Sequence, residues 1–287
     1  MHKRIRISPS YVLRTSQANL DSWIRSPRTM LMLIFVVSVC YLQVCGLQMT
    51  LEARGYEVNL IEALFYEFNF GCNMPMTTTL FLVMISELPR QLTFHQYSLI
   101  RSSRLEWALA QVLYCICMVI AMVLLILLCL SIMLTPMIDG IVGWSDPDRI
   151  ANGIVFPEDA LIDEYIRYFT PLVALIIAIT PVFLFWLIMV LVVLLCGMYN
   201  RATFGVLSYA FITLSNVIIY YEFFPIDLRM PIHFATLKNI VAGYAGKEIE
   251  HLLFVVVIDM LIIFLLISTI IARAQKADLC FYPENRL

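Results

Sequence analysis

Long apolar stretches without charge alternate along this chain with shorter polar segments. No Asp, Glu, Lys or Arg occurs in residues 29–51, 107–138 or 168–200. Each of these stretches exceeds the roughly 20 residues that a helix needs to cross about 30 Å of hydrocarbon. A helix on the surface of a soluble core keeps one polar face, so helices that are apolar on all sides over this length indicate a membrane protein.

Three further segments continue the pattern. Residues 68–86 and 202–221 are free of charge, and Asp259 is the exception within 251–272. We therefore predict an all-α membrane protein with six transmembrane helices in a single transmembrane domain over residues 1–287. By length and apolarity, the predicted spans are about 29–49, 72–90, 108–134, 169–197, 202–221 and 252–272.

Two intervening segments are too polar or too broken to cross the membrane. Residues 52–70 hold an apolar stripe that we expect to lie on the outer membrane face, formed by Leu60, Ala63, Leu64 and Phe68. Residues 222–251 are apolar but interrupted by Pro225 and Pro231. Because backbone at membrane depth must be helical or buried in protein, we predict a re-entrant, broken helical hairpin in the outer leaflet at 222–251.

The leader, residues 1–28, is basic and carries a short amphipathic pattern. Leu20, Trp23 and Ile24 follow helical i, i+3, i+4 spacing. This spacing favours an interfacial helix on the inner membrane face, with Trp23 at headgroup depth. The alternative is a solvated basic tail.

Charge sorts the polar segments into two groups. Hydrophobic residues make up 61% of the chain and charged residues 14%, which leaves little for a soluble domain. Basic residues gather in the leader, in 88–104 and after the last span, whereas acidic residues gather in 52–67 and 135–168. Since basic loops stay cytoplasmic, we predict cytoplasmic N and C termini and an acidic extracellular loop at 135–168.

Catalytic and cofactor motifs are not found. The chain has no phosphate loop, no HExxH and no GxSxG, and its four histidines are scattered. We therefore predict no catalytic residue, no bound cofactor or metal, no enzymatic activity and no nucleic-acid partner. Asp259 is the clear candidate for an intramembrane substrate or gating contact, and the alternative is a bundle-facing carboxylate satisfied by a polar group of another helix.

The segment between the second and third spans has a distinctive composition. Pro89 ends the second span, Phe94 and Tyr97 follow, and Arg101, Arg104 and Trp107 lead into the third span. The Arg-x-x-Arg-x-x-Trp approach, the amphipathic leader, the six predicted spans and the broken hairpin together resemble the membrane subunits of type-2 ABC exporters. The resemblance is one of layout and covers nearly the whole chain, except that the long acidic loop departs from it.

The resemblance implies a permease domain that moves a substrate across the cytoplasmic membrane. Separate ATP-binding subunits would hydrolyse ATP, and a second copy or a homologous permease subunit would complete the pore within the lipid bilayer. Residues 88–104 would form the segment that couples to the ATPase. Its candidate contacts are Phe94, Tyr97, Arg101 and Arg104, with Trp23 and Trp107 as interfacial anchors.

Other functions fit parts of the pattern. A non-transport sensor or assembly scaffold would use the acidic outer loop to recognise a ligand. A secondary carrier is less favoured, because such carriers need intramembrane charges and this chain has few. No motif specifies a substrate, so peptides, lipids, drugs and polysaccharide precursors are all compatible.

The predicted topology can be tested by cysteine labelling. In a background without the eight native cysteines, single cysteines are introduced, one within 144–165 and one within 276–287. We expect the first to react with an impermeant reagent from outside and the second only after the membrane is opened. Labelling of both from the same side would contradict the topology.

Overall fold

In the computed structural model of the protein, the described residues lie mostly in helices. The structure describes residues 8–54, 58–69, 73–86, 88, 103–138, 140–141, 143–145, 169–199, 201, 203–211 and 248–276. These residues contain no strand, which confirms the all-α prediction for this part of the chain. Most of the acidic loop at 135–168 and most of the hairpin at 222–251 lie outside the described residues.

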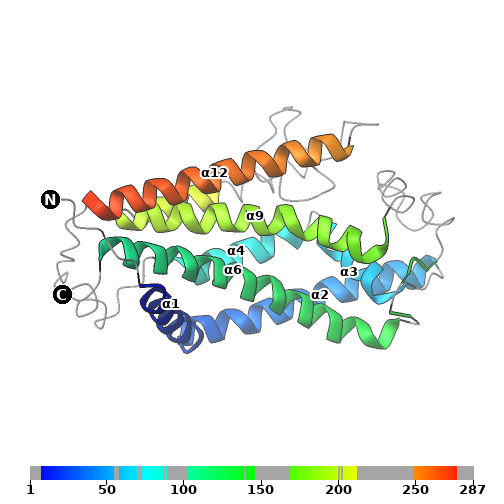
Figure 1. The fold of residues 1–287 in the computed structure, drawn as a ribbon. Helices are drawn as coiled ribbons and strands as arrows, with labels where there is room; N and C mark the ends of the chain where they lie inside the picture. Colours follow the sequence, from blue (N-terminus) through cyan, green and yellow to red (C-terminus); the bar gives the residue numbers. More distant parts are fainter. Residues whose placement is uncertain are drawn as a thin grey trace.

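Four helices are long and apolar enough to cross a membrane, as expected for a multi-pass membrane protein. They are α2 (Pro27–Arg54), α6 (Arg104–Leu134), α9 (Pro171–Met198) and α12 (Glu248–Lys276). At about 1.5 Å per residue each exceeds the roughly 30 Å of a hydrocarbon core. Figure 1 shows these four helices running side by side, with α12 along one edge of the bundle.

The two remaining predicted spans are helical over part of their length. The predicted span at 72–90 contains α4 (Asn73–Ile85), and the predicted span at 202–221 is helical over 203–211. At about 1.5 Å per residue neither described piece would cross a bilayer alone. The described residues therefore contain four of the six predicted spans as long apolar helices, and the count of six stays a prediction.

Contacts between helix termini define one end of the bundle, which we call the basic end. The Arg28 Nη1 group at the start of α2 donates a hydrogen bond of 3.1 Å to the Ser86 hydroxyl just beyond α4. Arg104 Nη1 at the start of α6 donates to the carbonyl oxygen of Gln275 in α12, at 3.2 Å. The start of α2 and α6 and the end of α4 and α12 therefore meet here.

The opposite end, which we call the distal end, is held by hydrogen bonds around Asn59. The Asn59 side-chain amide donates to the carbonyl oxygen of Gly143 at 3.1 Å, and the Leu60 N–H donates to that of Gly140 at 3.1 Å. A Cβ atom at Gly140 would overlap the Asn59 side-chain oxygen, so the close approach requires glycine there. The Trp144 indole N–H donates to the Phe169 carbonyl oxygen at 3.0 Å, just before α9 begins.

These contacts fix the direction of each helix. Helices α2 and α6 run away from the basic end, whereas α4, α9 and α12 run toward it (Figure 1). Because α9 and α12 run in the same direction, the chain between them must return from the basic end to the distal end. The helical residues 203–211, which begin this return, pack closely on α9: a Cβ at Gly205 would lie 2.9 Å from the Cys196 Cβ.

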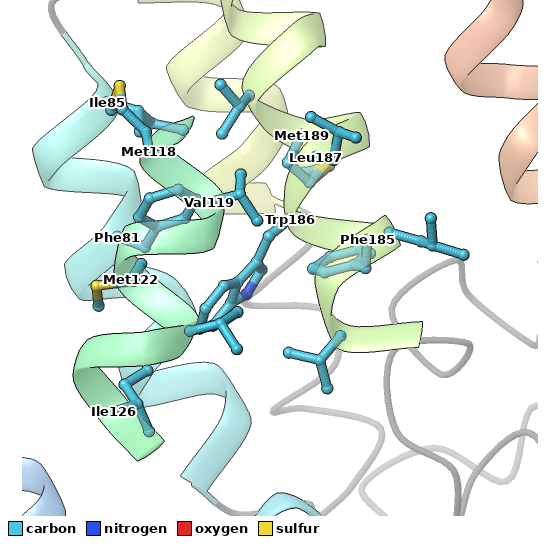
Figure 2. Close-up of a cluster of buried hydrophobic side chains, with 14 of the residues drawn as sticks. Phe81, Ile85, Met118, Val119, Met122, Ile126, Phe185, Trp186, Leu187 and Met189 are labelled. Carbon is cyan, nitrogen blue, oxygen red and sulfur yellow. The ribbon is translucent and has the colours of Figure 1, made fainter. Parts of the chain in front are cut away.

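A buried tryptophan organises the centre of the bundle. Trp186 of α9 lies beside Phe81 of α4, with ring centroids 5.2 Å apart, and faces Met118 and Met122 of α6 (Figure 2). Its indole N–H donates to the Thr78 hydroxyl at 3.1 Å. In this core the apolar rings of the indole pack against apolar side chains, and its N–H has a hydrogen-bond acceptor. A polar group in an apolar interior requires such an acceptor.

The short helix α3 (Leu60–Asn69) differs from the surface helix that the sequence predicted for 52–70. It packs against α9 and α6 at the distal end. The apolar stripe is buried as expected at Ala63, Leu64 and Phe68, but Phe65 and Tyr66 are buried as well. The physical reason is that α3 contacts protein on more than one side, whereas a helix on a membrane surface buries a single stripe.

Candidate functional site

The first turn of α6 is closed by a capping box. The Ser103 hydroxyl accepts a hydrogen bond from the Glu106 N–H at 3.2 Å, and the Glu106 carboxylate accepts one from the Ser103 N–H at 2.9 Å. A Ser-x-x-Glu sequence just before an apolar run is the local signature of this arrangement. We did not predict the cap, although its signature is present at residues 103–106.

The same carboxylate joins α6 to α1 (Pro9–Ile24). Glu106 Oε1 accepts a hydrogen bond of 2.7 Å from the Ser8 N–H at the start of α1, while Oε2 serves the capping box. Glu106 is only 7% exposed. A hydrogen bond to a charged group contributes about 1.5–3 kcal/mol, and the N-terminal end of a helix favours a negative charge. Glu106 is therefore a fixed joint between two helices, which we call the Glu106 joint.

Helix α1 crosses the direction of the long helices and packs on α6 (Figure 1). Its buried side chains are Thr15, Ser16, Asn19 and Trp23. Ile24, which the sequence placed on the apolar face, is 48% exposed. The contact with α6 determines which side chains of α1 are buried. In a helix that packs on protein, the shape of the neighbouring surface decides this as well as the apolarity of each side chain.

The two predicted interfacial anchors lie within the protein's own packing. Trp23 is 6% exposed and Trp107 is 2% exposed. Both indoles belong to helices that meet near the basic end, where the inner membrane surface is predicted. In this structure protein covers the two rings, and anchoring by Trp23 and Trp107 stays a prediction.

Of the predicted coupling residues, the structure describes Arg104 alone. Phe94, Tyr97 and Arg101 lie outside the described residues, as does most of 88–104. Arg104 is exposed, and its bond to the Gln275 carbonyl oxygen ties the first turn of α6 to the last turn of α12. A cation that binds a C-terminal carbonyl also offsets the partial negative charge at that end of the helix.

Asp259 lies on the buried stripe of α12, together with Val255 and Ile263. Its carboxylate is 9% exposed, so it faces the bundle and not the lipid. It makes no hydrogen bond or ion pair with the residues that the structure describes. One interpretation of the sequence required a polar group of another helix to bind this carboxylate, and the described residues contain no such group. A buried carboxylate without a partner costs free energy in an apolar environment.

A second buried carboxylate, at the distal end, was not identified from the sequence. Glu62 of α3 is fully buried, and its Oε2 accepts hydrogen bonds from the Ser145 N–H at 3.0 Å and the Ser145 hydroxyl at 2.8 Å. Asn59-x-x-Glu62 is again a capping signature, but nothing local identifies Ser145 as the partner. Glu62 thereby fastens α3 to the connection between α6 and α9.

No group of three or more His, Cys, Asp or Glu side chains suited to a metal ion occurs among the described residues. Comparisons with protein-family models, with curated proteins and with solved structures found no match to this chain. Its function must therefore be inferred from the residues themselves.

Replacing Glu106 tests the joint. Glu106→Ala removes the acceptor shared by the Ser8 and Ser103 N–H groups and with it half of the capping box, so we expect a loss of about 0.5–2 kcal/mol in the free energy of unfolding. Thermal unfolding in detergent measures it. Glu52→Ala is the matched control, because Glu52 is exposed and its carboxylate accepts a bond from Gln48, four residues earlier. Equal unfolding midpoints for the two variants would contradict the role of Glu106.

Replacing Asp259 tests the unpaired carboxylate. Asp259→Leu removes a desolvated polar group, so we expect a more stable protein with reduced activity. Thermal unfolding and the ATPase activity of the complex with the expected ATP-binding subunits are the two measurements. Ser268→Leu, at an exposed position of the same helix, is the control and should change neither. Unchanged stability and activity in Asp259→Leu would exclude Asp259 from the functional site.

Proposed function

We propose that this chain is the membrane-spanning permease subunit of an ATP-driven ABC exporter in the cytoplasmic membrane. It would work with separate ATP-binding subunits and with a second copy or a homologous permease subunit. The observation that carries the proposal is the Glu106 joint. It lies where residues 88–104, the predicted coupling segment, continue into α6.

A permease without its own ATPase must receive movement through a contact. The receiving segment therefore needs a rigid attachment to the helices that it moves. Here the capping box fixes the start of α6, the Ser8 N–H bond attaches α1 to it, and Arg104 attaches α12. A displacement at the C-terminal end of the coupling segment would thus reach α1, α6 and α12 together.

The scarcity of charge within the spans supports an external energy source. Among the described residues of α2, α6, α9 and α12, Asp259 is the one charged side chain that lies away from a helix end. A proton- or ion-coupled carrier commonly uses chains of intramembrane carboxylates or histidines. The position of Asp259 instead suits a single contact with a substrate or between helices.

The basic end provides the orientation. Arg25, Arg28, Arg104, Arg201 and Arg273 lie at the helix termini that meet there, which favours a cytoplasmic location. The ATP-binding subunits would bind at this end. The distal end, with Glu62 bound to Ser145 and with the acidic loop, would face outward.

The coupling assignment can be tested with a double substitution. Phe94→Ala with Tyr97→Ala removes the aromatic contacts proposed for a groove on the ATPase, so we expect an inserted, folded permease with little substrate-stimulated ATP hydrolysis. Copurification of the ATPase and its hydrolysis rate are measured. Phe35→Ala with Tyr41→Ala, two exposed aromatic residues of α2, is the matched control.

Full ATPase binding and stimulation in the double variant would refute the coupling role of 88–104. If the tagged native chain brings down no ATPase from its own membranes, the exporter proposal fails and the sensor or scaffold alternative is favoured. Arg101→Glu and Arg104→Glu are compared separately. Arg104→Glu should also lower stability, since Arg104 holds the end of α12.

A further inference from the structure

Three basic residues lie at the adjoining ends of α9 and α12. Arg201 follows α9, and its backbone N–H donates to the Cys196 carbonyl oxygen at 3.0 Å. The Arg273 guanidinium carbon lies 4.4 Å from the centroid of the Tyr199 ring, which brings the last turn of α12 onto the end of α9. Lys276 follows one turn later and ends α12. We call Arg201, Arg273 and Lys276 the α9–α12 cation cluster.

The described part of the chain offers these three cations no anionic partner. In the part of the chain that the structure describes, none of them forms an ion pair, and the buried Arg273 Nε atom has no hydrogen-bond acceptor. Glu106, a carboxylate at the same end, is already bound to the N–H groups of Ser8 and Ser103. Cations at adjoining helix ends that form no ion pair within the described residues create a positive potential, which attracts an anion.

The C-terminal ends of α9 and α12 contribute partial negative charge at this place. At α12 this charge is already offset by Arg104, which donates to the Gln275 carbonyl oxygen. The net field of the cation cluster is therefore positive.

An apolar flank begins directly beside the cluster. Ile262, Leu266, Thr269 and Arg273 are spaced by four, three and four residues, so they share one face of α12. Ile262 is exposed and Leu266 is partly exposed, and α12 is the least covered of the four long helices. Along this face, the positive charge of Arg273 thus lies next to an exposed apolar surface.

We propose that the α9–α12 cation cluster binds the phosphate of an anionic phospholipid, with an acyl chain along the exposed flank of α12. Basic pockets between transmembrane helices at the cytoplasmic surface suit such headgroups. Arg273 stacks on Tyr199 through its guanidinium face, which leaves its terminal N–H groups free to form a bidentate bond to phosphate. An acidic protein surface would be complementary in charge to the cations, but it would not account for the adjoining apolar flank.

The test measures lipid binding by the purified chain alone. The protein in nanodiscs of phosphatidylcholine is titrated with phosphatidylglycerol, and retained lipid is counted by native mass spectrometry. Arg273→Gln with Lys276→Gln should weaken binding about 30-fold, since each basic residue near an anionic surface contributes roughly five-fold. Arg14→Gln with Arg25→Gln removes two exposed cations of α1 and its vicinity and should change binding less than about two-fold.

A specific lipid site is distinguished from general surface charge and from a protein-binding site by the pattern of losses. Equal losses in the two double variants would overturn the proposal, because general surface charge would then account for binding. Competition by glycerol phosphate as strong as that by phosphatidylglycerol would overturn the role of the flank. Unchanged lipid binding in the variant Arg273→Gln with Lys276→Gln would overturn the lipid site and favour a protein partner for the cluster. Arg273→Lys keeps the charge but loses the bidentate geometry, so it should recover part of the affinity that Arg273→Gln loses, and this recovery excludes misfolding as the cause.

The experiment does not depend on the proposed exporter function, because no ATPase is present in it. A chain that binds no ATPase but retains phosphatidylglycerol at this cluster would refute the exporter and leave the lipid site standing. The reverse result would leave the exporter standing and overturn the site.

Discussion

Hydrocarbon offers no hydrogen bonds, so each polar group at membrane depth must find its partner within the protein. The hydroxyls on the long helices meet this requirement locally. Thr180, Ser131 and Ser268 each donate to the carbonyl oxygen four residues earlier. The same requirement holds separate helices together at Thr78, whose carbonyl oxygen accepts from the buried Tyr209 hydroxyl at 3.1 Å.

Two buried side chains in the described parts of the predicted spans break this rule. Asp259 has no partner among the described residues, and the fully buried amide of Gln111 has none for either its Nε2 or its Oε1 atom. An unpaired buried amide costs about 1–3 kcal/mol. Places where a fold tolerates such a cost are often those where function requires it. Stability alone therefore does not explain the presence of these two residues within the predicted spans.

The long helices could be predicted from the sequence because membrane thickness imposes a minimum length. The predicted spans at 108–134 and 169–197 differ from α6 and α9 by a few residues at their ends. The sequence predicted the buried face of α12 only through Asp259, which both interpretations directed toward the bundle. This helix is apolar on nearly all sides, so no periodicity marks Val255, Asp259 and Ile263 as the inner stripe.

The site shows the same division between local and distant signals. The capping box at Ser103 and Glu106 is a four-residue pattern that sequence alone contains. Its bond to Ser8 joins residues 98 positions apart, and no local rule gives that pairing. Phe94, Tyr97 and Arg101 were selected through a family resemblance, and the described residues do not include them.

The bond between Glu62 and Ser145 has a consequence for how the chain assembles during synthesis. The two residues are 83 positions apart, so α3 is made well before its partner exists. At a synthesis rate of about 5–20 residues per second, Ser145 is added to the chain roughly 4–17 seconds after Glu62. During that interval the Glu62 carboxylate must stay hydrated at the membrane surface, because burying it unpaired would be costly. The distal end therefore closes late in biogenesis, only after α6 and the connection that follows it have been synthesised.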